Sequence, residues 1–316
     1  MTGEHNQARR RPGRMLVALL ACVVAAFALA ACGSSKSGSS STEGSTSTTS
    51  ASGGSQIKSG SLLTDGTITY GTDFTEPPYE SIINGQQQGF DVEFGKLLAQ
   101  QLGLKPQFLD NRFATLIPAL AAHKFDVILS SMYITAERLR QVDFVPYLDT
   151  GDVIVVKKGG AYQPKTALDV CGHTFSINSG AAVASIASGP LSKQCKQAGK
   201  QPINVKLFPS DLASLQEVAA GRADVTFVDP ALLKSLQTTA GRDLGLEVSS
   251  APGKLLYPVA VGIAVRQSDP TVKAALTAAI QRLDQNGQLA ALRARYAISP
   301  PSEALVKQAE QQAAGQ

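Results

Sequence analysis

Two stretches of the sequence, residues 116–127 and 214–225, share a pattern that constrains the fold more than any other feature. Each reads as a helix with one apolar face, a short turn with a basic residue, and the pair Asp-Val opening an apolar strand. When the stretches are superposed, Ser131 falls on Asp229, so a polar residue follows each strand. In open α/β sheets, that strand end faces the ligand crevice. The pattern predicts two α/β lobes facing each other across a cleft; the alternative is a chance match between two common units.

The stretch from residue 125 to 146, FDVILSSMYITAERLRQVDFVP, reads as a buried strand, a polar turn and a helix. Thr135 is placed to cap this helix, which puts Arg138 near its third position, where a cation opposes the helix dipole. An anion beside Arg138 would remove the conflict, and the candidates are a ligand carboxylate, Asp143 and Glu137. From these residues alone, a solvated or internally paired Arg138 is the simpler interpretation.

Strands and helices alternate through the rest of the chain, as expected for an α/β fold. Apolar runs predict strands at residues 67–71, 104–109, 174–177, 204–208 and 259–265. Apolar periodicity and capping residues predict helices at residues 90–102, from 181, 210–220 and 272–283. Residues from Pro300 onward are polar, and we expect a frayed tail there.

The chain opens with four arginines and an uncharged apolar run, residues 15–31. A basic segment, an apolar run and small residues before a cleavage point are typical of a secretory signal. The ending Leu29-Ala30-Ala31-Cys32 resembles a bacterial lipobox, which implies that residues 1–31 are removed and that Cys32 carries lipid. The alternative is an uncleaved transmembrane anchor, for which the run is slightly short of ~20 apolar residues.

Residues 33–60 are almost entirely Gly, Ser, Thr and Ala. Such a segment cannot bury a core, so we expect residues 32–61 to form a lipidated, flexible tether that holds a globular domain off a membrane.

Charge and cysteine content narrow the possible partners. The net charge of +4 includes a net +3 in the leader, so the mature chain is nearly neutral and offers no electrostatic basis for nucleic-acid binding. Cys171 and Cys195 are an even pair in an exported chain, which predicts a disulfide. His123 and His173 add no zinc-like spacing, and we predict neither a metal nor a cofactor.

Five segments, in this order, resemble the polar amino-acid-binding proteins of ABC importers, the bacterial extracellular solute-binding proteins of family 3: GTDFTEPPYE, GFDVEFGKLLAQQLG, FATLIPALAAHKFDVILSSMYITAERLRQVDFVPY, INSGAA and GRADVTFVDP. The resemblance covers residues 67–298. It implies a two-lobed flytrap, the periplasmic-binding-protein fold, in which the chain crosses twice between lobes and closure buries the ligand.

The resemblance also implies how the chain is divided between the lobes. Lobe 1 would comprise residues 62–156 and 261–298, and lobe 2 residues 157–260. The crossings would lie near Val155 and Val261, and residues 299–316 would form the polar C-terminal tail.

The resemblance implies ligand contacts at both ends of an amino acid. Arg138 matches the residue that pairs with the ligand α-carboxylate, where a planar fork fits two oxygens. Ala182 matches a helix-start position whose backbone amide also binds the carboxylate. Asp229 matches the acid that holds the α-ammonium, and Ser131 a position whose carbonyl binds that group.

Two further positions carry an alternative interpretation. Asp73 matches a strand-end acid near the ammonium side of the pocket, and its alternative is an acceptor in an Asx-turn. Phe113 matches a residue that packs on the ligand side chain, and its alternative is a core position.

Three departures from the family pattern bear on the ligand. Tyr133 stands where a Ser or Thr usually donates to the carboxylate, and Ala181 and Ala182 stand where hydroxyl residues are common. Glu76 replaces an aromatic residue that usually covers the ligand. These changes weaken the carboxylate clamp, so the ligand need not be a simple α-amino acid. Glu76 points to a ligand with a second positive group, unless Arg112 folds over it.

The resemblance implies an extracytoplasmic receptor, lipid-anchored to the outer face of the cell membrane, that delivers an amino acid or similar polar solute to an ABC permease and its ATPase. Two alternatives remain open. One is a secreted enzyme of the same fold, such as a dehydratase, although the chain has no serine nucleophile elbow, HExxH or P-loop motif. The other is a ligand-dependent sensor that presents itself to a receptor.

Overall fold

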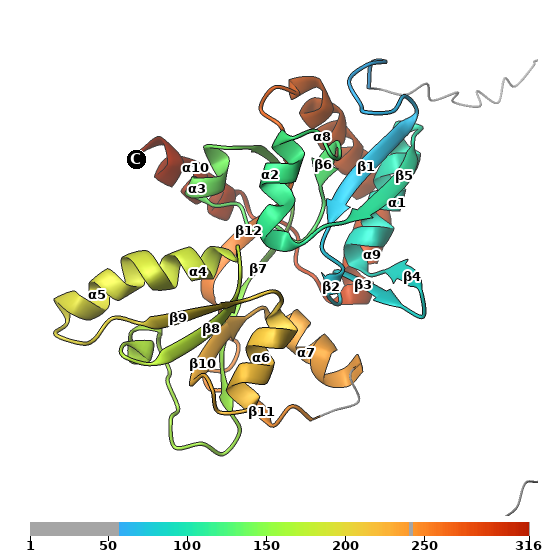
Figure 1. Cartoon of the computed structure of the whole chain (residues 1–316). Helices are drawn as coiled ribbons and strands as arrows, with labels where there is room; N and C mark the ends of the chain where they lie inside the picture. The colour runs from blue at the N-terminus through green and yellow to red at the C-terminus, as the bar shows by residue number, and fades with distance from the viewer. Residues whose placement is uncertain (1–56, 240–242, 316) are drawn as a thin grey trace, which may run out of the picture. The chain divides into compact units, whose positions relative to one another are not determined.

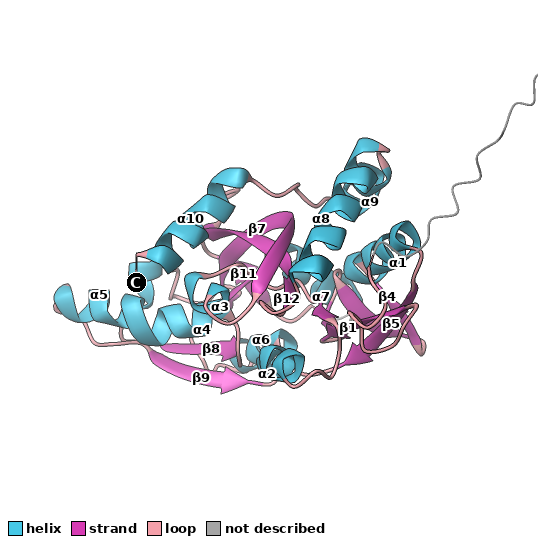
Figure 2. Ribbon diagram, turned by 90° about the horizontal axis from the view of Figure 1, so that it is seen from above, coloured by secondary structure: helices cyan, strands magenta, loops and turns pink. Residues whose placement is uncertain are grey.

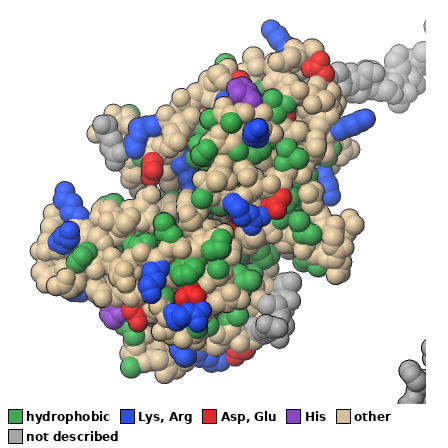
Figure 3. All heavy atoms as spheres, in the orientation of Figure 1, with side chains coloured by type: hydrophobic (Ala, Val, Ile, Leu, Met, Phe, Trp, Pro, Cys, Tyr) green, Lys and Arg blue, Asp and Glu red, His purple; other side chains and the backbone are tan. Residues whose placement is uncertain are grey.

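The computed structural model describes residues 57–239 and 243–315, which fall in one compact unit, Ala51–Gln316. The predicted signal peptide, the acylated Cys32 and most of the tether lie outside the described residues. Within the described ranges, no helix has both the length and the apolar character needed to cross a bilayer. On the face seen in Figure 3, the Lys and Arg side chains of the described residues lie scattered among acidic ones and form no continuous basic surface.

Two long antiparallel strands, β7 (Asp143–Lys157) and β12 (Leu256–Val265), run through the centre of this unit (Figure 1). They pair from Asp143↔Val265 to Asp152↔Leu256, with two shifts of register. Because both strands are long and rich in branched apolar residues, each contributes side chains to more than one hydrophobic core.

Strand β7 changes partner between Asp152 and Val153. Up to Asp152 it pairs with β12, and from Val153 onward it pairs with β10 (Val225–Val228). This change lies a few residues before the crossing expected near Val155.

The first lobe is built on strands in the order β5-β1-β6-β12-β7, with β1 parallel to both β5 and β6. Its elements are β1 (Thr67–Thr72), β5 (Lys105–Asp110), β6 (Val127–Ile128), α1 (Phe90–Leu102), α2 (Leu116–Ala121), α3 (Ala136–Leu139), α8 (Pro270–Gln285) and α9 (Gln288–Tyr296). Helices α1, α8 and α9 share one hydrophobic core, and α2 belongs to a second core. A small sheet, β2 (Thr75–Glu76), β3 (Glu80–Ile83) and β4 (Gln86–Gln88), lies beside them.

The second lobe continues the sheet in the order β7-β10-β8-β9, and β11 also pairs with β7. Its remaining elements are β8 (Thr174–Asn178), β9 (Asn204–Phe208), β11 (Leu246–Val248), α4 (Ala182–Ile186), α5 (Ser192–Gln197), α6 (Asp211–Ala219) and α7 (Pro230–Thr239). Helices α4 and α5 contribute to one core, and α6 and α7 to another.

The two similar stretches of sequence occupy equivalent places in the two lobes. Residues 116–127 form α2 and lead into β6, and residues 214–225 run from α6 into β10. The predicted α/β class and two-lobed architecture are confirmed.

The predicted disulfide is also confirmed. Cys171 and Cys195 are bonded, their Cα atoms are 5.5 Å apart, and they are separated by 24 residues. Cys195 on α5 is fully buried in the core of the second lobe. A loop of this length corresponds to a stabilisation of ~3 kcal/mol in the chain-entropy estimate.

The expectation of a frayed tail from Pro300 onward is wrong. Residues Glu303–Ala314 form helix α10, and the Ser302 hydroxyl caps it by accepting from the Leu305 amide at 3.3 Å. Ala309 is buried, and α10 packs against α3 and β12 (Figure 2). Most of the other residues of α10 face solvent, so the helix needs only a few apolar residues where it packs against α3 and β12.

Candidate functional site

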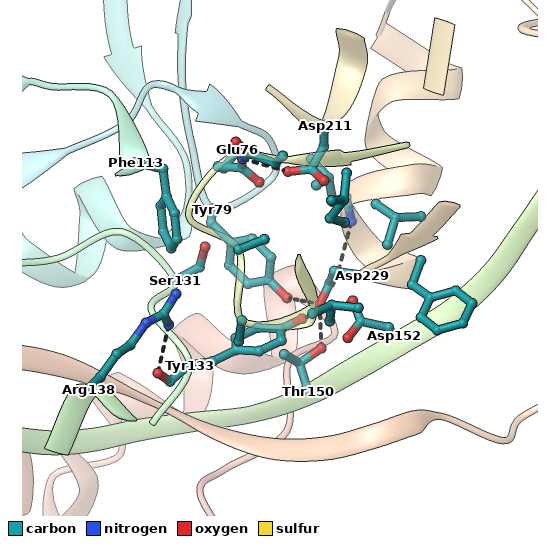
Figure 4. Close-up of a pocket in the computed structure, with 18 residues that line it drawn as sticks. Glu76, Tyr79, Phe113, Ser131, Tyr133, Arg138, Thr150, Asp152, Asp211 and Asp229 are labelled. Atoms are coloured by element: carbon teal, nitrogen blue, oxygen red, sulfur yellow. Dashed lines mark hydrogen bonds between the residues drawn. The ribbon is translucent and has the colours of Figure 1, made fainter. Parts of the chain in front are cut away.

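A cavity lies between the two lobes, with about 570 Å³ of empty space including its opening (Figure 4). Seven of the eight residues predicted to contact the ligand line it: Glu76, Phe113, Ser131, Tyr133, Arg138, Ala182 and Asp229. Ser131 and Asp229, the residues paired by the internal pattern, meet here because each follows the end of a strand.

Asp73 is the predicted contact that does not line the cavity. It is fully buried behind the wall, where its carboxylate accepts from the Phe113 amide at 2.8 Å and from the Thr75 hydroxyl at 2.9 Å. Arg112 pairs with it at 3.0 Å. The Thr75 amide also donates to Asp73, at 3.2 Å, which matches the Asx-turn alternative, and the separate bond from the Phe113 amide holds the segment that presents Phe113. Because Arg112 forms this ion pair with Asp73, it does not fold over Glu76.

Arg138 is buried at the third position of α3, where Thr135 caps the helix as predicted. Its guanidinium donates to the Tyr133 carbonyl at 2.8 Å and to the Gly180 carbonyl, in the other lobe, at 3.0 Å. The central carbon of the guanidinium, Cζ, lies 5.3 Å from the centroid of the Phe113 ring. Burial lowers the pKa of Arg138 to about 10, which leaves it charged at neutral pH.

No carboxylate of the described residues forms a salt bridge with Arg138. Of the candidate anions, Asp143 pairs instead with Lys273 at 3.1 Å. The Arg138 charge is therefore met by carbonyl dipoles, and an anionic ligand group in the cavity would improve its environment.

Asp229 sits between the lobes and caps α7. One carboxylate oxygen accepts from the amides of Ala231 and Leu232 at 2.7 and 2.9 Å. The other accepts from the hydroxyl of Tyr79, in the first lobe, at 3.0 Å, and from the hydroxyl of Thr150 on β7. Burial raises the pKa of Asp229, while the bond from Thr150 opposes that shift.

Glu76 contacts the other lobe through Asp211 and Asn178. The Asn178 amide donates to Glu76 at 3.3 Å and to Asp211 at 3.0 Å, and the two carboxyl groups are hydrogen-bonded to each other. Burial, followed by the charge of Asp211, raises the pKa of Glu76 well above its usual range. Of the two acids, Glu76 is therefore the one that holds a proton more readily, as expected for an acid without a cationic neighbour.

Asp152 is a fourth carboxylate in the wall, and the sequence did not identify it. It lies on β7 and is 4% exposed, and the Tyr133 hydroxyl approaches it at 3.4 Å. Among the described residues, the cavity lining thus has four carboxylates and one basic residue, Arg138. In Figure 4, Arg138 lies on one side of the cavity, and Asp152, Asp229 and Asp211 lie on the opposite side.

Ala182 and Ser131 bring backbone groups to the cavity. Ala182 is the first residue of α4, and Ala181 before it offers no side-chain cap. Ser131 has a backbone φ of 37°, a left-handed conformation that a residue with a side chain adopts only when its surroundings enforce it.

The enforcing group is a buried pair of acids, Glu80 and Asp91. Asp91 accepts from the Ser131 amide at 2.8 Å and from the Tyr147 hydroxyl at 2.8 Å, and Glu80 accepts from the Ser130 hydroxyl at 2.7 Å. Burial raises the pKa of Glu80 well above its usual range and that of Asp91 to about 6. Glu80 Oε2 and Asp91 Oδ1 have no other partner in the described part of the chain, so a proton held on Glu80 would join the two side chains and keep Asp91 in place against the Ser131 amide.

The effect of replacing Glu80 on stability is expected to depend on whether the new side chain can still donate a hydrogen bond to Asp91. Glu80→Leu leaves Asp91 and Ser130 short of partners and should reduce the free energy of unfolding by ~1–3 kcal/mol, whereas Glu80→Gln keeps a donor and an acceptor. Folding raises the pKa of Glu80 above 4.5, so its stabilisation is complete below that pH and declines as the pH rises. Urea unfolding at about pH 5 and pH 8 should show wild type losing stability relative to Glu80→Gln. Equal destabilisation by Gln and Leu would rule out the shared proton.

Comparison with known proteins shows the class. The family model for bacterial extracellular solute-binding proteins, family 3, matches residues 68–299. The chain is 31% identical over 236 residues to the L-arginine-binding protein of Pseudomonas aeruginosa, covering 73% of this chain and 88% of the relative. It is 26% identical over 233 residues to an L-cystine-binding protein of Escherichia coli, covering 73% and 82%. A mutant of ArgBP from T. maritima has a TM-score of 0.64 at 32% identity, covering 73% of this chain and 95% of that structure.

The fold and the interlobe cavity define a flytrap protein with a substrate-binding role. The chain belongs to the bacterial extracellular solute-binding proteins of family 3. This family supplies amino-acid-binding proteins to ABC transporters and works outside the cytoplasm, and the relatives named above are binding proteins.

Proposed function

We propose that this protein captures a basic amino acid, or a close derivative of one, between its lobes and delivers it to an ABC permease. The observation that carries the proposal is the imbalance of charge in the cavity, where four carboxylates face one guanidinium. A buried excess of negative charge is costly unless a ligand supplies cations. The arginine-binding function of the relative in Pseudomonas aeruginosa agrees with this choice.

The two ends of the cavity suit the two charges of an amino acid backbone. Arg138 is charged and lacks a carboxylate partner among the described residues, so it receives the α-carboxylate, together with the Ala182 amide. Asp229 and the carbonyl of Ser131 receive the α-ammonium. Phe113, which flanks Arg138, packs against the aliphatic part of the ligand.

The remaining acids favour a second positive group. Glu76, Asp211 and Asp152 all line the cavity, and none of them pairs with a Lys or Arg of the described residues. When a cationic group enters, the proton shared by Glu76 and Asp211 is no longer needed to neutralise the pair and is released. Affinity for a cationic ligand should therefore rise with pH over the range in which Glu76 loses that proton.

Glu76→Gln is expected to weaken cationic ligands selectively. The amide keeps the bonding to Asp211 and Asn178 but cannot become negative, so L-arginine and L-lysine should lose about three- to tenfold in affinity, with L-glutamine little changed. Calorimetry with cationic, neutral and acidic amino acids measures this ranking. Asp143→Asn, a carboxylate replaced away from the cavity, is the matched control. An unchanged ranking, or a wild type that prefers neutral or acidic ligands, would exclude the role of Glu76.

Delivery to a permease is tested in cells. Deleting the gene for this chain should reduce uptake of labelled L-arginine, and a copy carrying Arg138→Ala should fail to restore it. Normal uptake without the gene would favour a sensory function. Acylation of Cys32 remains part of the proposal, since an anchored receptor stays close to its permease.

A further inference from the structure

Among the four carboxylates of the cavity, Asp152 is the least satisfied. Asp229 accepts four hydrogen bonds, and Glu76 and Asp211 bond to each other and to Asn178. Asp152 has only the long contact from Tyr133, and its second oxygen, Oδ2, is buried without a partner in the described part of the chain. A buried carboxylate left in this state normally destabilises a protein.

No other described residue accounts for Asp152. Burial, followed by the charges of Asp229 and Asp211, raises the pKa of Asp152 well above its usual range. The described residues also contain no cluster of His, Cys, Asp or Glu able to hold a metal ion. Neither a structural partner nor a metal site in the described residues therefore explains why the Asp152 carboxylate is buried.

The position of Asp152 suits an extended ligand. It is one of five residues that line both the interlobe cavity and a second, open groove bordered by residues of α3, α4, α10 and β12; the other four are Tyr133, Arg138, Ala182 and Val183. Tyr257, whose neighbour Leu256 pairs with Asp152 across the strands, lines the groove, and its ring lies 6.4 Å from that of Phe227 in the cavity wall. A carboxylate among aromatic rings is a setting for an alkylammonium or guanidinium group.

We propose that Asp152 is a cation subsite that directly binds the positively charged end of the ligand side chain, with Tyr133 and Tyr257 beside it. This inference rests on the proposed function and assigns the contact that distinguishes a basic from a neutral amino acid. Glu76 and Asp211 then act at longer range through their charge, and Asp229 remains the partner of the α-ammonium.

The test compares L-arginine with L-citrulline, in which a neutral ureido group replaces the guanidinium. Calorimetry should show that Asp152→Asn weakens L-arginine at least about tenfold and L-citrulline less than about threefold, with Asp143→Asn as the control on the same strand. Without ligand, Asp152→Asn should melt at an equal or higher temperature than wild type, because it removes a buried carboxyl group that lacks a partner for Oδ2. The selectivity lost in Asp152→Asn should exceed that lost in Glu76→Gln.

Other results would overturn the subsite or separate it from the proposed function. Equal losses for L-arginine and L-citrulline, or a lower melting temperature without ligand, would make Asp152 a structural residue. If neither L-arginine nor L-lysine binds wild type, the proposed function is wrong, and agmatine and putrescine then test the subsite alone. A rise in melting temperature with either amine that disappears in Asp152→Asn supports it, and no rise with either amine overturns it.

Discussion

Replacing Asp229 with alanine is expected to weaken ligand binding by about 30-fold or more, corresponding to a loss of ~2–5 kcal/mol for an unpaired buried charge. The ligand ammonium would lose its carboxylate partner at a site where Tyr79 and Thr150 hold that carboxylate in place. Titration calorimetry with L-arginine measures the change. A variant that binds L-arginine as tightly as wild type would contradict the assignment of Asp229.

The alanine substitution also removes the cap of α7, so a second variant separates the two effects. Asn is as good a helix cap as Asp, and Asp229→Asn therefore keeps the bonds to Ala231 and Leu232 while removing the charge. We expect Asp229→Asn to retain the stability of the ligand-free protein and still bind poorly. If Asn restores binding, the loss in Asp229→Ala comes from the helix cap.

Replacing Arg138 with alanine is expected to cause a loss of similar size, about 30-fold or more, because the ligand carboxylate would be buried without a cation. Arg138 also bridges the lobes through its bond to the Gly180 carbonyl, so the variant should favour an open cleft. Small-angle scattering with and without L-arginine measures closure, and calorimetry measures affinity.

Arg138→Lys is the matched comparison. Lysine keeps the charge but lacks the planar fork that binds two oxygens and stacks on Phe113, so its affinity should fall between those of wild type and Arg138→Ala. The assignment of a carboxylate-binding role would fail if agmatine, which has no carboxylate, lost as much affinity as L-arginine in Arg138→Ala.

Local sequence patterns predicted the fold because they coincide with local structure. Phe90, Phe94 and Leu98 lie on one buried face of α1, and Gly103 ends that helix in a left-handed conformation with a φ of 69°. Ser210 caps α6 as its position suggested. The tail was misjudged because its polar composition outweighed the capping serine, Ser302, and the acidic first turn of α10.

The site was predicted less completely because several of its residues meet only in the tertiary structure. Asp152 lies in the middle of a long strand, and no turn or cap marks it in the sequence. Asp211 reads as an ordinary acid in the first turn of a helix, and its meeting with Glu76 depends on the other lobe. The family resemblance placed Asp73 near the ammonium side of the pocket, but its side chain pairs with Arg112 and accepts from the Phe113 amide, and it does not line the cavity.

The central claim is that the cavity selects an amino acid with an additional positive charge. The most direct measurement is titration calorimetry of the wild-type protein at neutral pH with L-arginine, L-citrulline and L-glutamate. The account predicts that L-arginine binds most tightly, that L-citrulline binds at least about tenfold more weakly, and that L-glutamate gives no measurable heat of binding. Binding of L-glutamate or L-citrulline as tight as that of L-arginine would contradict it.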